Sequence, residues 1–172
     1  MKTKDMCLIA LMAALICVAG PMTAPIGMVP LSLATFAVYL SGAVLGAKRG
    51  TLAVAVYILV GLVGIPVFSG FSGGVQKVAG VTGGYIIGYL PCALITGLAV
   101  CGDASPKWKL PLFMVAGTAV LYAVGTAWFM IQSGSMLGAA LSACVIPFLP
   151  GDAIKIIAAS ALAWPIRKAV YQ

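Results

Sequence analysis

The sequence contains no histidine and only three acidic residues, Asp5, Asp103 and Asp152, among 172 residues. Without histidine, a Ser-His-Asp triad and most acid–base sites that work near neutral pH are excluded. The cysteines form no CxxC pair, so we expect them to pack as small apolar residues and not to hold zinc. A GxxxxGK[ST] phosphate loop is also missing, which excludes ATP hydrolysis by that route. These absences argue that the chain is not an enzyme.

Charge of either sign is scarce. Only 8% of the residues are charged, 63% are hydrophobic, and the mean hydropathy is +1.17. A soluble domain carries roughly a quarter charged residues. The composition therefore predicts an all-α integral membrane protein that forms one domain over residues 1–172. With about 20 residues per span, the length allows about six transmembrane helices.

The apolar runs are separated by segments rich in proline, glycine or charge, which interrupt helices. We expect a tight or re-entrant turn at 22–30, a basic turn at 48–50 and a short helical piece within 132–149. The approximate limits of the six expected spans are 6–22, 31–47, 51–66, 82–101, 110–131 and 150–166.

The basic residues predict the orientation in the membrane. If the N-terminus is cytoplasmic, the outer side carries only Lys77 and Lys155 of the ten basic residues. The positive-inside rule then places both termini in the cytoplasm. Because the charges are spread along the chain in pairs, the net charge of +7 does not indicate nucleic-acid binding. The eight cytoplasmic residues are Lys2, Lys4, Lys48, Arg49, Lys107, Lys109, Arg167 and Lys168.

Asp152 and Lys155 stand at the start of the last expected span, three residues apart and therefore on one helix face. Ionisable groups at membrane depth usually line a cavity or form a pair. A cation near a helix N-terminus opposes the helix dipole, so Lys155 requires an anion, which Asp152 or a ligand carboxylate could supply. A binding site is favoured, and a structural ion pair or a snorkelling lysine remains the alternative.

Other features near the outer side are open to two interpretations. The glycine-rich segment 67–80 is either a ligand-binding or a merely flexible loop. Thr82 stands at a helix start, where its hydroxyl could cap the backbone. Trp128 and Gln132 lie four apart at the outer end of the fifth span, where Trp128 suits the interfacial aromatic belt better than a ligand contact. The Ala10-x-x-x-Ala14 spacing permits close helix approach, within the bundle or to a partner.

Three stretches carry a resemblance to a known family: 61–69, 82–88, and 147–152 together with Lys155. Through them the chain resembles the BioY family, the biotin-binding membrane subunits (S components) of energy-coupling factor (ECF) transporters. The resemblance covers essentially the whole chain, and the stretch with Asp152 and Lys155 is the most specific. It implies a six-helix S-component fold with an outward-facing pocket, in a prokaryotic plasma membrane.

The resemblance also implies a ligand site. Asp152 and Lys155 are expected to contact biotin, and the loop before the fourth span is expected to close over it. A tight site needs directed hydrogen bonds for the ureido group and apolar walls for the ring and tail. The further residues that we expect in this site are Thr82, Gly83, Tyr85, Gln76, Phe71 and Trp128.

The partners follow from the resemblance as well. Ala10 and Ala14 are implied to dock on the transmembrane coupling subunit, and two ATP-binding subunits are implied to supply the energy. No cofactor is expected, because biotin is the ligand.

Two other functions remain open. Within the same class, the chain could be an S component for another vitamin, such as thiamin or riboflavin, although a flavin site favours more stacking aromatics than the 15 present. From another class, it could be a structural subunit of a membrane complex. The expected buried charge pair argues against this alternative.

Overall fold

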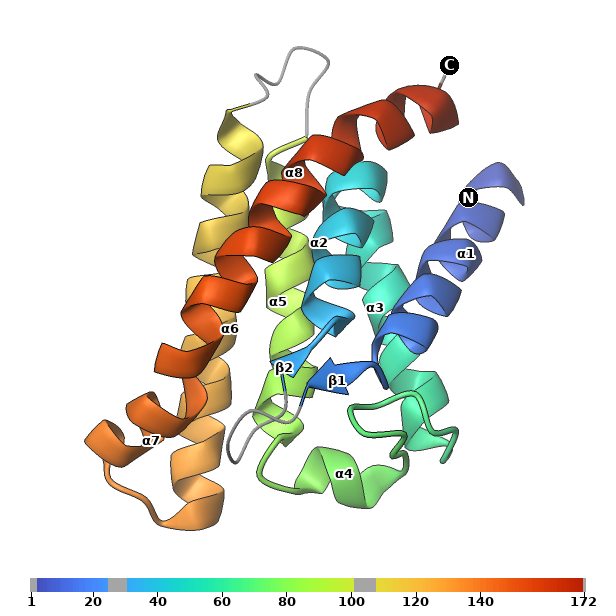
Figure 1. Cartoon of the computed structure of the whole chain (residues 1–172). Coiled ribbons are helices and arrows are strands. Elements are labelled where there is room, and N and C mark those ends of the chain that lie inside the picture. Colours follow the sequence, from blue (N-terminus) through green and yellow to red (C-terminus); the bar gives the residue numbers. More distant parts are fainter. Residues whose placement is uncertain (1–2, 25–30, 101–107, 172) are drawn as a thin grey trace.

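The computed structural model describes residues 3–24, 31–100 and 108–171. This part of the chain forms a bundle built mainly of helices (Figure 1). The long helices are α1 (Thr3–Ala19), α2 (Ala34–Leu45), α3 (Ala47–Leu62), α5 (Gly83–Leu98), α6 (Lys109–Ser133) and α8 (Leu149–Tyr171). The short elements are β1 (Thr23–Ala24), β2 (Leu31–Ser32), α4 (Val75–Ala79), α7 (Leu137–Cys144) and the 3-10 turn η1 (Ile146–Phe148).

Helix α5 lies in the middle of the bundle, between α6 and the pair α2 and α3, and α8 crosses α2 (Figure 1). Helix α2 is mainly apolar and is buried on nearly every side, as expected for a central helix. Small residues allow the helices to approach closely. A Cβ atom built on Gly97 of α5 would lie 2.3 Å from the backbone nitrogen of Ala47, where α3 begins.

Each of the six apolar stretches expected as spans overlaps one long helix, with ends displaced by a few residues, and the helical fold class is confirmed. Two local expectations need correction. The second helix begins at Ala34, because Leu31–Ser32 pairs antiparallel with Thr23–Ala24. The expected basic turn at 48–50 is wrong: the chain reverses at Gly46, whose φ of 80° suits glycine, and residues 48–50 lie in α3.

Two helical stretches, Lys109–Ser133 and Leu137–Tyr171, are long and apolar enough to cross a membrane. Helices α2 and α5 are also apolar but shorter. The expected re-entrant turn at 22–30 lies for the most part outside the described residues.

The start of α1, the junction of α2 and α3 and the end of α8 lie at one end of the bundle (Figure 1). Most of the charged residues in the described part of the chain belong to these segments. There Arg49 pairs with Asp5 at 2.9 Å. Arg167 donates to the carbonyl oxygens of Val44 and Val100, each at 3.1 Å, near the ends of α2 and α5. Carbonyls at helix ends lack partners within the helix, so Arg167 ties three helices together at this end. Asp103 lies outside the described residues.

We expect Gly97→Ala to lower the unfolding temperature in detergent, because its Cβ would collide with backbone atoms of Ala47 that cannot rotate away. Overpacking of this kind costs about 1–3 kcal/mol. Gly138→Ala in α7 is the matched control, since a Cβ there meets nothing within 4 Å. Equal unfolding temperatures for the two variants would contradict this packing.

Candidate binding site

Asp152 and Lys155 form an ion pair in the first turns of α8, inside the bundle. The Nζ atom of Lys155 lies 2.9 Å from Oδ1 of Asp152. Asp152 is only 4% and Lys155 only 8% exposed. Taking two charges out of water costs several kcal/mol per ion, so such a pair persists only where further hydrogen bonds satisfy both groups.

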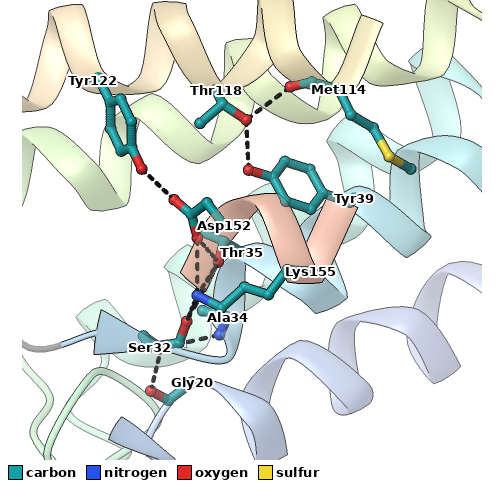
Figure 2. Close-up of polar contacts among 10 residues, drawn as sticks. All are labelled: Gly20, Ser32, Ala34, Thr35, Tyr39, Met114, Thr118, Tyr122, Asp152 and Lys155. Atoms are coloured by element: carbon teal, nitrogen blue, oxygen red, sulfur yellow. Dashed lines mark hydrogen bonds and ion pairs between the residues drawn. The ribbon is translucent and has the colours of Figure 1, made fainter. Parts of the chain in front are cut away.

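Lys155 has all three of its N–H groups engaged. Besides Asp152, its Nζ donates to the carbonyl oxygen of Ser32 at 2.7 Å and to Oγ1 of Thr35 at 2.9 Å (Figure 2). A lysine ammonium carries three donors. Lys155 therefore accepts no new partner unless it gives up one of these three.

Asp152 has spare capacity. Oδ1 faces Lys155 and also Thr35, whose hydroxyl lies at 3.4 Å. Oδ2 accepts a hydrogen bond of 2.5 Å from the hydroxyl of Tyr122 on α6 (Figure 2). A carboxylate oxygen accepts about two hydrogen bonds, so Oδ2 can take one more donor. The site thus offers an acceptor to a ligand more readily than a donor.

Ser32 connects the pair to the neighbouring helices. Its hydroxyl donates to the carbonyl oxygen of Gly20, just beyond α1, and accepts from the backbone N–H of Ala34 at the start of α2 (Figure 2). Because its own carbonyl accepts from Lys155, one serine joins α1, α2 and α8. The β1–β2 pairing holds Ser32 in this place.

A cavity opens beside the ion pair. Four aromatic rings wall it, from Tyr85, Tyr89, Tyr122 and Phe148. Its free volume is about 50 Å³, well below the roughly 300–1,000 Å³ of typical small-ligand pockets. A bicyclic ligand therefore enters only if lining groups move. The other lining residues are Ser32, Thr35, Ser69, Thr82, Ile86, Leu121, Asp152 and Lys155.

A wider, more open depression lies beside this cavity, with a volume of about 700 Å³. It shares Ser32 and Lys155 with the cavity and is also lined by Phe71 and Leu33. The shared residues make the depression the approach from solvent to the ion pair.

Four of the expected site residues line the cavity itself: Asp152, Lys155, Thr82 and Tyr85. The alternative for Thr82, a side-chain cap on the following helix, is wrong, because its hydroxyl makes no capping hydrogen bond. The Thr82 side chain is buried, and it lines the cavity.

The structure places the other four elsewhere. Gly83 packs at the start of α5, where a Cβ would collide with the carbonyl oxygen of Val78. Gln76 is exposed on α4. Phe71 is 74% exposed and borders only the outer depression. Trp128 does not line the cavity and donates from Nε1 to the carbonyl oxygen of Gly80.

Several lining residues were not expected from the sequence. One is Tyr89, which follows the expected Tyr85 by four residues and so lies on the same face of α5, a usable sequence signal. Ser32 and Thr35 are polar residues three apart at the start of an apolar run, another usable signal. Nothing local marks Tyr122 among the aromatic residues of α6.

The described residues contain no group of three or more metal-ligating side chains. Cys144 at the end of α7 is fully buried and packs as a small apolar group against Phe129 and Phe148.

Comparison with known proteins assigns the family. A profile described as the BioY family matches residues 1–172. The chain belongs to the BioY family. "Biotin transporter BioY" of Thermotoga maritima is 40% identical over 155 residues, covering 90% of each chain. "Probable biotin transporter BioY" of Pyrococcus horikoshii is 39% identical over 163 residues, covering 95% of this chain and 96% of the relative.

A solved structure is also similar. It is described as the "S-component for biotin from an ECF-type ABC transporter", and it matches with a TM-score of 0.88 and 27% identity over 100% of this chain and 95% of the other. BioY-family membership confirms the expectation that the chain is a membrane transport component and not an enzyme.

The ion pair should be coupled energetically. We expect Lys155→Met to destabilise the protein by about 3 kcal/mol, because it leaves Asp152 buried without a cation. Asp152→Asn combined with Lys155→Met should cost less than the sum of the single changes, with a coupling energy on the order of 1–3 kcal/mol. Unfolding of the wild type, both single variants and the double variant in detergent measures this. Additive effects would show that the two side chains do not interact.

Proposed function

We propose that this chain is the high-affinity biotin-binding subunit of an ECF-type uptake system. It captures biotin from outside the cell and delivers it to the cytoplasm together with an ATP-driven module. The observation that carries the proposal is the buried Asp152–Lys155 pair beside an aromatic cavity, in a chain whose fold resembles an S component for biotin.

The six long helices are the membrane spans of the proposed subunit, in a prokaryotic plasma membrane. The gathering of basic residues at the end where α1 begins and α8 ends supports a cytoplasmic location for both termini (Figure 1). The cavity, α4 and α7 then lie towards the outer side, where the vitamin arrives.

The free acceptor position on Asp152 suits the ureido ring of biotin. That ring presents N–H donors, and Oδ2 of Asp152 can accept one while it keeps the hydrogen bond from Tyr122. The rings of Tyr85, Tyr89 and Phe148 supply an apolar wall for the sulfur-containing ring and the aliphatic tail.

Lys155 takes part by exchanging partners. A ligand oxygen, from the ureido carbonyl or the carboxylate, can replace the Thr35 hydroxyl or the Ser32 carbonyl on Nζ. Replacement of one acceptor by another keeps the ammonium satisfied throughout, which avoids the cost of a buried, unpaired charge. Because Ser32 and Thr35 line the narrow cavity, the exchange also moves part of its wall.

The exposed face of α1 is the proposed docking surface for the transmembrane coupling subunit. Ala10 and Ala14 are exposed, whereas Ala13 is buried at 4% exposure and packs inside the bundle. Small residues four apart let another helix approach closely. Two ATP-binding subunits would complete the module.

Titration of the purified protein with biotin, and with thiamin and riboflavin as competitors, tests the function. We expect tight binding of biotin alone. Binding of thiamin or riboflavin in place of biotin would show that the chain is an S component for that vitamin. Folded protein that binds none of the three would leave a structural subunit as the better account.

Asp152→Asn and Lys155→Ala should each weaken biotin binding by a hundredfold or more, about 2.7 kcal/mol, because each leaves a buried partner unpaired. Asp5→Asn is the control, since Asp5 is also buried and paired but lies at the other end of the bundle. The affinity of the Asp5→Asn variant for biotin should stay within about threefold of the wild-type value. Calorimetric titration with biotin measures the affinity of all three variants. Unchanged affinity in folded Asp152→Asn protein would show that the ion pair is not part of the biotin site.

Ala10→Leu combined with Ala14→Leu should abolish co-purification with the coupling subunit and biotin uptake, because the larger side chains prevent close helix approach. Biotin affinity of the isolated variant should not change. Ala116→Leu, at an exposed alanine of α6, is the control and should retain uptake. Normal uptake by the double variant would contradict this docking face.

A further inference from the structure

Two side chains on α6 hold the end of the short helix α4. Nε1 of Trp128 donates to the carbonyl oxygen of Gly80 at 3.0 Å, and Nε2 of Gln132 donates to that of Ala79 at 2.9 Å. The two donors are one helical turn apart, and the two acceptors are consecutive. They thus tie the C-terminal end of α4 to α6, and the carbonyl oxygen of Gly80 accepts a further hydrogen bond from the N–H of Gly83 at 3.0 Å.

Little else attaches α4 to the bundle. None of its five residues is buried. Its partly buried Val78 packs against the core, and the N–H of Gly74 donates to the carbonyl oxygen of Gly61 at 2.7 Å. A segment with few buried apolar contacts opens locally at low free-energy cost. The two hydrogen bonds from α6 therefore contribute much of what holds α4 against the bundle.

The longer segment that contains α4, residues 69–82, borders the cavity at both of its ends. Ser69 and Thr82 line the cavity, and Phe71 lines the outer depression that leads to Lys155. We call residues 69–82 the lid segment. Its backbone is strained at Phe71, whose φ of 55° is unusual for a residue other than glycine.

Gly83 and Gly84 explain how Trp128 comes within reach of the lid segment. A Cβ on Gly84 would lie 2.3 Å from Cβ of Trp128, and one on Gly83 would lie 3.3 Å from its Nε1. Only glycine at position 84 lets the start of α5 pack this closely against α6. The glycine pair thus serves the placement of Trp128.

We propose that Trp128 and Gln132 form a latch that holds the lid segment closed over the biotin site and so sets the rate at which biotin enters and leaves. They are positioning residues, because neither lines the cavity. The proposal rests on the proposed function in naming biotin. The latch itself stands on the hydrogen bonds and on the weak attachment of α4.

Tryptic cleavage after Lys77, in the middle of α4, reports opening of the lid segment, because α4 must unfold locally to be cut. The test compares wild type, Trp128→Phe, Gln132→Leu and the double variant in detergent. The Phe variant keeps an aromatic ring but loses the N–H donor. Trp108→Phe is the matched control, at an exposed tryptophan at the other end of α6.

Each lost hydrogen bond should accelerate cleavage after Lys77 about fivefold, and the double variant about 25-fold, with biotin release accelerated in parallel. Cleavage at exposed Lys48 and Lys168, at the other end of the bundle, should not change. Gly84→Ala should behave like Trp128→Phe, since it displaces the same side chain.

Three results would overturn the latch: unchanged cleavage after Lys77, faster cleavage at all sites, or faster cleavage after Lys77 with an unchanged rate of biotin release. If the wild type binds no biotin, the proposed function fails. The cleavage measurement then still decides whether Trp128 and Gln132 hold the segment.

Discussion

A charge pair lies inside this apolar bundle, and the surrounding elements are placed so that both charges find partners. Asp152 and Lys155 are nearly inaccessible to water, and their mutual attraction alone does not offset the loss of hydration. The missing stabilisation comes from Ser32, Thr35 and Tyr122, which belong to β2, α2 and α6. These elements therefore converge on the first turns of α8 and hold that end of the helix in place.

The need to satisfy both charges also governs how a ligand can bind. Lys155 has no donor to spare, whereas Asp152 retains room for one more hydrogen bond on Oδ2. A ligand with N–H donors can add to Asp152, and a ligand oxygen reaches Lys155 only by exchange. Such an exchange loosens Ser32 or Thr35, which tie α8 to α2 and the end of α1. Ligand binding at Asp152 and Lys155 is in this way connected, through Ser32, to α1, the helix that carries the proposed docking face.

Much of this arrangement could be predicted from the sequence. Hydropathy and helix breakers located the six long helices, and the rarity of charge singled out Asp152 and Lys155. The partners of the pair could not be predicted locally, because Thr35 lies 117 residues from Asp152 in sequence and Tyr122 lies 30 away. The hydrogen bond of Trp128 could not be predicted for the same reason, because its partner, Gly80, is 48 residues away. The aromatic-belt and ligand interpretations of Trp128 both concern its ring and not its N–H.

The structure of the protein with biotin bound would show whether the ion pair is the ligand site. A ureido N–H of biotin should lie within hydrogen-bond distance of Oδ2 of Asp152, with the rings of Tyr85, Tyr89 and Phe148 around the ligand and Lys155 bonded to a ligand oxygen in place of Thr35 or Ser32. Biotin bound elsewhere, with the hydrogen bonds of Lys155 unchanged, would exclude the pair as the ligand site.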